Sequence, residues 1–187
     1  MEQAVRADAR RNRARLVEAA RRLFAEVGIE AASMNDVARR AGVGPGTLWR
    51  HFPNKEALIA EVVGESLDEL AELADELRAA GAPDGVRRWT SALLQHIASY
   101  RGLAASLAHA SDDLLAGRCV ASEQALARLV EHARGTGELR ADVTGPEVSR
   151  LTTAVAWAAE AAGEPESAKR LLDLVFSGLT DRAECPP

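Results

Sequence analysis

Apolar side chains recur at helical spacing along almost the whole chain, and this periodicity constrains the fold more than any other feature. Near the N-terminus they follow the i, i+4, i+7, i+8, i+11 pattern of one buried helix face, with Leu16, Ala20, Leu23, Phe24 and Val27. Strand signals are missing, since there is no alternating run of β-branched residues and no Asn-Gly hairpin turn. The sequence therefore predicts an all-α protein of about nine helices.

Capping residues, glycines and prolines predict where these helices begin and end. Gly28 ends the first helix as its C′ residue. Ser33, with Asp36 three positions later, resembles a capping box that opens a second helix. Pro45, whose φ is already helical, opens a third helix that runs to about His51. Further helices are expected over residues 54–77, 86–100, 103–107, 114–133, 146–162 and 166–181.

Charge is divided unevenly between the two ends of the chain. Residues 1–55 hold 11 Lys and Arg against 6 Asp and Glu, a net charge of +5. The rest of the chain carries −10, which gives the whole-chain value of −5. This asymmetry indicates that the N-terminal third meets a polyanion, although arginines on solvated helix faces would give the same count.

The stretch VARRAGVGPGTLWRHFPNKEAL, residues 37–58, places a glycine turn between two short helices. Two helices joined in this way form a helix-turn-helix, whose second helix enters the DNA major groove. Leu48 and Phe52 are spaced i, i+4 and are expected to be buried, so Thr47, Trp49 and their neighbours face outward. The alternative is an ordinary helical hairpin with a partly buried Trp49.

Residues 15–63, RLVEAARRLFAEVGIEAASMNDVARRAGVGPGTLWRHFPNKEALIAEVV, resemble the tetracycline-repressor (TetR) family of bacterial regulators. The resemblance implies a three-helix DNA-binding domain over residues 1–53 and a helical regulatory and dimerisation domain over residues 54–187. Two positions depart from the family pattern. Trp49 stands where Tyr is usual, and Gly44-Pro45 stands where Ser-Lys is frequent.

Transferred residue by residue, the resemblance implies a DNA-binding surface made of nine positions. These are Ser33, Asn35, Pro45, Gly46, Thr47, Trp49, Arg50, His51 and Lys55. An arginine-rich N-terminal arm is expected either to reach the minor groove or backbone, or to remain a solvated tail, and it comprises Arg6, Arg10, Arg11, Arg13 and Arg15.

Aromatic residues of the C-terminal domain are candidates for a ligand site. Trp89, His96 and Tyr100 are spaced by seven and four, so they share one helix face. The predicted ligand-binding set is Trp89, Leu93, His96, Tyr100 and Trp157. These residues could equally fill the core.

Two apolar helices at the C-terminal end suit a four-helix bundle across a two-fold axis. The predicted dimer interface is Leu151, Val155, Leu172, Val175, Phe176 and Leu179. Packing within one chain is the alternative.

These observations favour a ligand-responsive repressor that binds a palindromic operator as a homodimer and is released by a small molecule. No nucleophile set, phosphate loop or metal-ligand spacing is present, so neither an enzyme nor a cofactor is expected. The distant Cys119 and Cys185 form no disulfide framework, and no membrane span or signal core is seen, so a cytoplasmic location is expected. A helical protein-binding adaptor is the other function considered, and a cysteine redox sensor a minor one.

Overall fold

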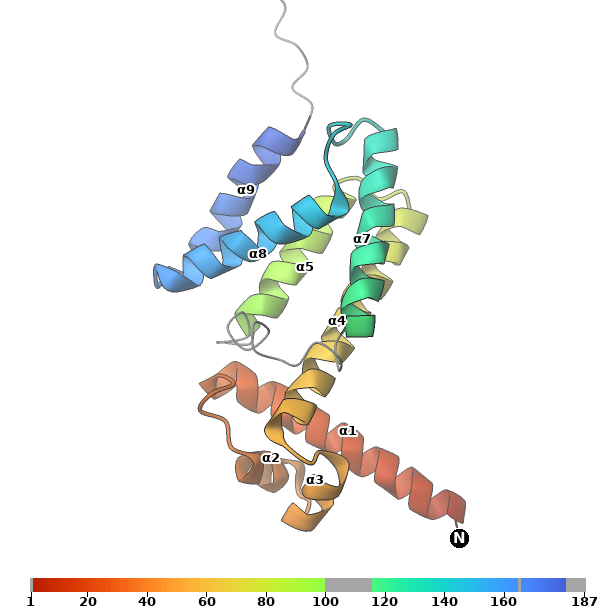
Figure 1. The fold of residues 1–187 in the computed structure, drawn as a ribbon, viewed down its shortest axis with the longest axis vertical. Helices are drawn as coiled ribbons and strands as arrows, with labels where there is room; N and C mark the ends of the chain where they lie inside the picture. Colours follow the sequence, from red (N-terminus) through yellow and green to blue (C-terminus); the bar gives the residue numbers. More distant parts are fainter. Residues whose placement is uncertain (1, 100–115, 165, 181–187) are drawn as a thin grey trace, which may run out of the picture. The chain divides into compact units, whose positions relative to one another are not determined.

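The computed structural model describes residues 2–99, 116–164 and 166–180, and these contain eight α-helices and no strand (Figure 1). The all-α prediction is confirmed. The short helix predicted at residues 103–107 lies outside the described residues. The helices are α1 (Glu2–Val27), α2 (Met34–Ala41), α3 (Pro45–His51), α4 (Lys55–Ala79), α5 (Gly85–Ser99), α7 (Ala116–Gly135), α8 (Gly145–Ala161) and α9 (Ser167–Leu179).

The predicted helix boundaries are confirmed at the first three junctions. Gly28 follows α1 with a φ of 84°, and its N–H donates to the carbonyl of Phe24. The Ser33 hydroxyl accepts from the Asp36 N–H at the start of α2, and Pro45 is the first residue of α3. Local chemistry alone thus sets these helix ends.

The described residues fall into two compact units, and α4 contributes to both. The first unit runs from the N-terminus to Glu65, and the second takes Ser66–Ala98 and resumes at Ala116. In the first unit, α1 packs on α2 and α3, and α2 packs on α3. Its buried side chains include Leu16, Phe24, Val37, Leu48 and Leu58. The core is therefore built around the helix-turn-helix.

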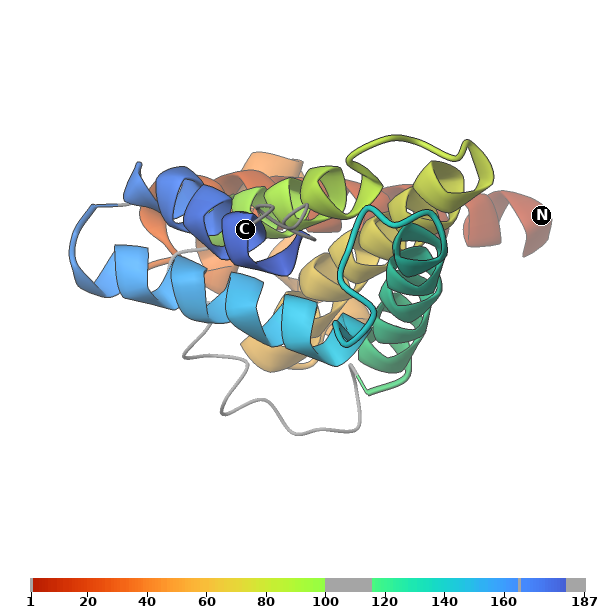
Figure 2. The same ribbon diagram turned by 90° about the horizontal axis from the view of Figure 1, so that it is seen from above.

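The second unit has a core drawn from all five of its helices. Trp89 of α5 is 2% exposed, and its indole N–H donates to the carbonyl of Leu70 on α4 at 2.9 Å. Helices α7 and α8 approach so closely that a Cβ on Gly145 would lie 2.9 Å from the Cα of Ala127. Helices α8 and α9 lie side by side in both ribbon views (Figures 1 and 2).

Arginine side chains form ion pairs between different helices of the second unit. Arg128 of α7 binds both carboxylate oxygens of Asp75 on α4, at 2.8 and 3.1 Å. Arg87 of α5 pairs with Asp173 of α9, and its guanidinium carbon lies 4.7 Å from the ring centroid of Phe176. The planar guanidinium suits both contacts, since it pairs with a carboxylate and stacks on a ring.

The last turn of α9 is capped from a distant part of the chain. In the loop after α7, the Arg140 backbone N–H donates to the carbonyl of Leu179, and the Arg140 side chain donates to that of Gly178. Both carbonyls belong to the helix end that lacks partners within its own helix. None of the helices in the described ranges combines the length and hydropathy needed to cross a membrane.

Candidate nucleic-acid interface

The turn between α2 and α3 depends on one glycine. Gly42 has a φ of 65°, in the left-handed region, and the N–H of Val43 donates to the carbonyl of Ala38. A side chain at Gly42 would also collide, because its Cβ would lie 2.8 Å from Nη2 of Arg15. Position 42 thus favours glycine for its left-handed backbone conformation, whereas the clash would displace only the flexible end of the Arg15 side chain.

The start of α2 is held by a reciprocal contact between Ser33 and Asp36. Besides capping the helix, the Ser33 hydroxyl donates to the Asp36 carboxylate at 2.6 Å. This hydrogen bond, followed by the charges of Arg39 and Arg40, lowers the pKa of Asp36 below its ordinary value of 3.8. Ser33 and Asn35 are both exposed at this helix end.

Helix α3 buries one face and leaves another open. Leu48, on α3, and the following Phe52 are buried as predicted, and the Phe52 N–H closes the helix by donating to the carbonyl of Leu48. Trp49 is 46% exposed. Pro45, Gly46 and Arg50 are also exposed, while Thr47 and His51 are half-buried. Six of the nine predicted DNA-binding residues belong to this seven-residue helix, and Leu48 is its one residue outside that set.

Near the start of α3, two glycines leave the backbone without side chains that cover it. Gly44 is the N-cap with a φ of −69°, which any residue can adopt, and nothing lies within 4 Å of a Cβ built on Gly44 or Gly46. The fold therefore does not require glycine at either position. Their missing side chains leave room for another molecule to approach the backbone closely.

Lys55 has a structural partner that its sequence context does not predict. Its Nζ donates to the carbonyl of Glu30 at 3.1 Å, which ties the start of α4 to the turn after α1. The side chain of the adjacent Asn54 accepts from the N–H of Ala57 at 2.7 Å and so caps the start of α4. Because the Glu30 contact spans 25 positions, no local sequence signal points to it.

The predicted arm is not a separate segment, because all five of its arginines lie on the single helix α1. Arg11 pairs with Asp8 one helical turn away. Arg13 donates to Glu61 on α4, so it is used within the first unit. Residues 6–15 are therefore helical and do not form a frayed tail, while contact of these arginines with DNA stays a prediction.

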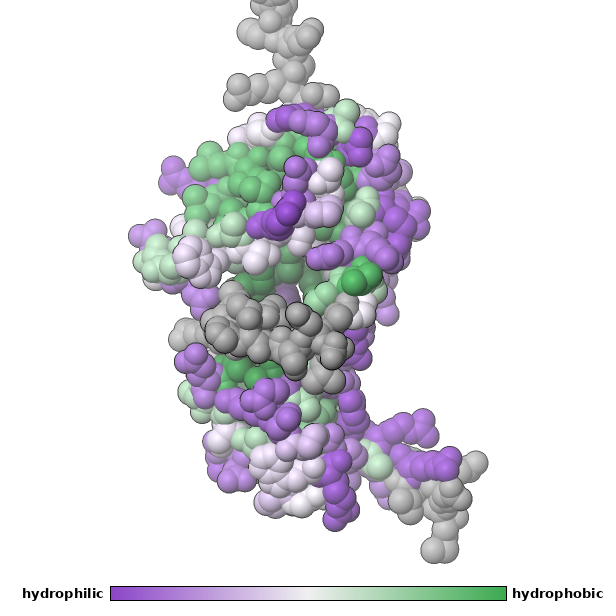
Figure 3. Space-filling model, in the orientation of Figure 1, coloured by the Kyte–Doolittle hydropathy of each residue, from purple (hydrophilic) through white to green (hydrophobic). Residues whose placement is uncertain are grey.

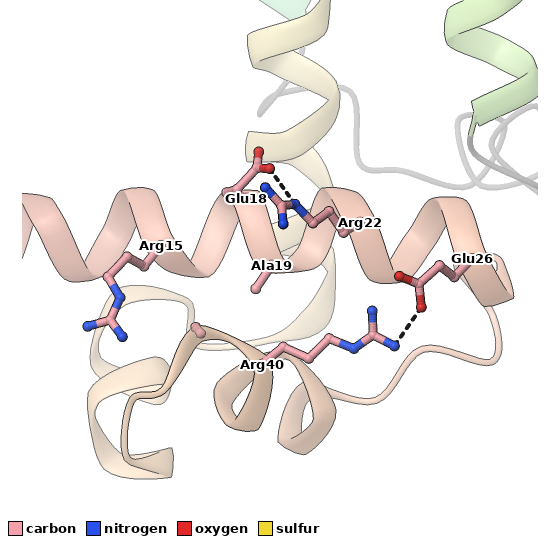
Figure 4. A pocket seen from close by; sticks show the side chains of 7 residues that line it. Arg15, Glu18, Ala19, Arg22, Glu26 and Arg40 are labelled. Carbon is pink, nitrogen blue, oxygen red and sulfur yellow. Dashed lines mark hydrogen bonds and ion pairs between the residues drawn. The ribbon is translucent and has the colours of Figure 1, made fainter.

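A groove of about 440 Å³ lies between α1 and the end of α2 (Figure 4). Arg22 pairs with Glu18 at 2.6 Å, and Arg40 pairs with Glu26 across the two helices at 2.6 Å. The charges on the groove walls thus largely neutralise each other. Its lining residues are Arg15, Glu18, Ala19, Arg22, Glu26, Arg40 and Ala41.

The predicted ligand-binding residues do not all come together. Trp89 and Leu93 lie in the core cluster of the second unit, and the neighbouring His96 is also buried. Tyr100 lies outside the described residues. Trp157 is 62% exposed, because α8 turns a different face, with Thr152 and Ala156, toward the core.

The predicted dimer residues also divide between core and surface. Leu172 and Phe176 are buried in the core of their own chain, whereas Leu151 is 38% exposed. Contacts within one chain thus leave Leu172 and Phe176 little surface for a partner, and the predicted interface stays a prediction. Val155, Val175 and Leu179 are half-buried. Figure 3 shows hydrophobic residues gathered over α9. Leu151 and Trp157 of α8 and Leu174 of α9 are exposed large apolar side chains.

No group of three or more His, Cys, Asp or Glu side chains within the described ranges could hold a metal ion. Cys119 is half-buried, and burial, followed by the charge of Glu123, raises the pKa of its thiol. A raised pKa opposes the reactive thiolate that a redox sensor needs.

A three-helix unit with a glycine turn and an exposed second helix defines the helix-turn-helix class of DNA-binding proteins. The family described as "Bacterial regulatory proteins, tetR family" matches residues 16–62. A second family, "Transcriptional regulator SbtR-like, C-terminal domain", matches residues 82–181, more than half of the chain. The chain therefore belongs to the TetR family of bacterial transcriptional regulators.

Similar proteins agree with this assignment. A TetR transcriptional regulator from Streptomyces coelicolor is 30% identical, with a TM-score of 0.71 over 91% of this chain and 99% of the other. A TetR regulatory protein from Mycobacterium vanbaalenii is 31% identical, with a TM-score of 0.69 over 95% and 99% of the two chains. An HTH-type transcriptional regulator of Staphylococcus aureus (strain USA300) is 47% identical over 64 residues, only 34% of this chain and 35% of that relative. The chain thus matches about a third of the length of its curated relatives.

Proposed function

We propose that this protein is a homodimeric transcriptional repressor that binds a palindromic operator and is released by a small molecule. The observation that carries the proposal is the division of α3 into two faces. Leu48 fixes the helix on its unit, while Trp49 and Arg50 remain exposed. A recognition helix needs this combination, because it must be rigid and still offer side chains to base edges and phosphates.

The contacts at DNA follow from side-chain chemistry. Arg50 would pair with guanine or phosphate, and Thr47 would offer a methyl group to thymine or a hydroxyl to phosphate. Trp49 has one donor, its indole N–H, for a phosphate oxygen. Gly44 and Gly46 would let the backbone approach the duplex. Ser33, Asn35, His51 and Lys55 would contact the DNA on either side of the bases that α3 reads.

A dimer supplies the two half-sites that so small a motif needs for specificity. The exposed apolar side chains of α8 and α9 support an isologous interface on these helices, with Leu151, Trp157 and Leu174 at its centre. Val155, Val175 and Leu179 would complete it.

For the effector, we propose the α5 face that carries Leu93 and His96. The imidazole of His96 bonds Ser66 of α4, so a ligand that engaged His96 would change a contact made by α4. The ligand must prefer the non-binding state by its own differential affinity, typically about 1–3 kcal/mol of coupling.

The test is binding of the purified protein to duplex DNA from upstream of its own gene, against a scrambled duplex, across a salt series. Tight binding to the native duplex alone, weakening steeply with salt, supports a specific regulator. Equal affinity for both duplexes contradicts an operator in this fragment. An unchanged affinity in Arg50→Ala would contradict the proposed role of α3 and favour the adaptor.

A further inference from the structure

Arg13 of α1 contacts two parts of the first unit that lie far from it in the sequence. Its Nη1 donates to Oε1 of Glu61 on α4 at 2.5 Å. Its guanidinium carbon also lies 5.2 Å from the ring centroid of Phe52. Phe52 is the residue that ends α3, so a single side chain joins the end of the recognition helix to α4.

The surroundings of Arg13 suit these two contacts. Phe52 is buried, the Glu61 side chain is only 18% exposed, and that of Arg13 is 41% exposed. A guanidinium can stack its face on a ring while its N–H groups bind a carboxylate in the same plane. The hydrogen bond to Glu61 is the main cause that raises the pKa of Arg13.

A second ion pair supports the same packing of α1 against α4. Nη2 of Arg21 lies 3.1 Å from Oε2 of Glu65. The two arginines are eight positions apart on α1, and the two glutamates are four positions apart on α4. The neighbouring Arg22 makes no such link to α4 in these pairs, since it pairs with Glu18 on its own helix.

We propose that Arg13 is a positioning residue for DNA binding, which fixes the end of α3 against α4 through Phe52 and Glu61 and does not contact a DNA phosphate. The inference rests on the proposed function and adds the link between α4 and the recognition helix. The contact with Glu61 uses one of the five N–H donors of the guanidinium, so the salt dependence of binding has to show that no other donor reaches a phosphate.

The test compares Arg13→Gln, Arg13→Lys, Glu61→Gln and the double variant R13Q/E61Q with the wild-type protein. The matched control is Arg22→Gln, which removes the same charge from the same helix but leaves α4 untouched. Affinity for the specific duplex is measured at several salt concentrations, and thermal unfolding is followed in parallel.

The expected result is that Arg13→Gln and Glu61→Gln each weaken DNA binding about tenfold, as members of one network do. The double variant is expected to bind no worse than either single variant, and Arg22→Gln to bind like wild type. Glu61→Gln is decisive, because removing a negative charge would by itself tighten binding to DNA. Arg13→Lys keeps the charge but not the planar group, so it is expected to restore binding only in part.

The salt dependence separates positioning from direct contact. A positioning residue leaves the slope of log K against log salt unchanged, whereas loss of a phosphate contact lowers its magnitude by about 0.9. A lower slope in Arg13→Gln together with unchanged or tighter binding by Glu61→Gln would overturn the proposal. So would wild-type affinity in both variants.

A readout without DNA keeps this test independent of the operator. The indole N–H signal of Trp49, assigned by its loss in Trp49→Phe, is expected to shift in Glu61→Gln and Arg13→Lys but not in Arg22→Gln. If the variants fold and the Trp49 signal does not shift, Arg13 does not position α3 and the proposal is contradicted. If the wild-type protein instead bound no duplex specifically, the proposed function itself would fail and this inference with it.

Discussion

The Ser66 hydroxyl on α4 and the Nδ1 atom of His96 on α5 lie 2.5 Å apart, and both side chains are buried. A buried polar group that loses a hydrogen bond keeps part of the cost of its desolvation. Ser66→Ala is therefore expected to lower the free energy of unfolding by about 1–2 kcal/mol. Urea denaturation measures this change.

The control for Ser66 is Ser177, an exposed serine whose hydroxyl donates to Leu174 on its own helix. Ser177→Ala is expected to change stability by no more than about 0.5 kcal/mol. Equal losses in both variants would show that the Ser66–His96 bond contributes nothing specific.

Gly42 and Gly44 are expected to respond in opposite ways to the same substitution. Gly42→Ala is expected to cost about 1–2 kcal/mol, since it forces a left-handed conformation on alanine and displaces Arg15. Gly44→Ala is expected to leave stability within about 0.5 kcal/mol but to weaken DNA binding, because its Cβ would project from the start of α3. Thermal unfolding and DNA titration of both variants check this, and undiminished DNA affinity in Gly44→Ala would remove the proposed close approach.

The contact between Ser33 and Asp36 is expected to make stability depend on pH in the acid range. Because folding lowers the pKa of Asp36, the charged carboxylate stabilises the folded state above its ordinary pKa of 3.8, and this contribution is lost as pH falls through the folded pKa. The difference in stability between wild type and Asp36→Asn is therefore expected to be full at neutral pH and to shrink below pH 3.8. Chemical denaturation across pH tests this, and a difference that grows on acidification would contradict it.

Arg50 is expected to contribute to DNA affinity and to sequence preference together. Arg50→Ala should lose about 1–3 kcal/mol of binding to the specific duplex if the side chain pairs with guanine. Arg88→Ala removes another exposed arginine, on α5, and serves as the control, with wild-type binding expected. Fluorescence titration against native and scrambled duplexes measures both. A uniform loss across both duplexes would identify Arg50 as a phosphate contact.

The dimer is expected to depend on the exposed apolar residues of α8 and α9. Leu174 is 61% exposed, so Leu174→Arg places a charge in the proposed interface without disturbing the core. Sedimentation should then report monomers. Val120→Arg alters another exposed apolar residue, on α7, and is expected to leave the dimer intact. A Leu174→Arg dimer as tight as wild type would move the interface elsewhere.

The features predicted correctly from the sequence are those that depend on neighbours in the chain. Gly28, Ser33 and Pro45 mark helix ends because caps and turns act over a few residues. The burial of Leu48 and Phe52 follows from helical spacing alone. These local signals were enough for the fold class and for the exposed face of α3.

Contacts between distant helices were not predictable in the same way. The bond from Lys55 to Glu30 and that from Arg13 to Glu61 depend on how separate helices dock, which one sequence does not encode as a pattern. Trp157 illustrates the same limit, since the alanine-rich α8 has apolar residues on several faces and periodicity does not choose the buried one. Phe176 is the opposite case, since the sequence predicts it for a dimer interface but it is buried in the core of its own chain.

The bare first turn of α3 has a consequence for how this regulator can change over evolutionary time. Folding constrains Gly42, because its left-handed backbone conformation disfavours any side chain. Gly44 and Gly46 have open space around them, so single mutations can add side chains at the start of α3 while the chain still folds. Given the proposed DNA contacts of α3, substitutions at these two positions are expected to change which sequences the protein binds with little effect on its stability.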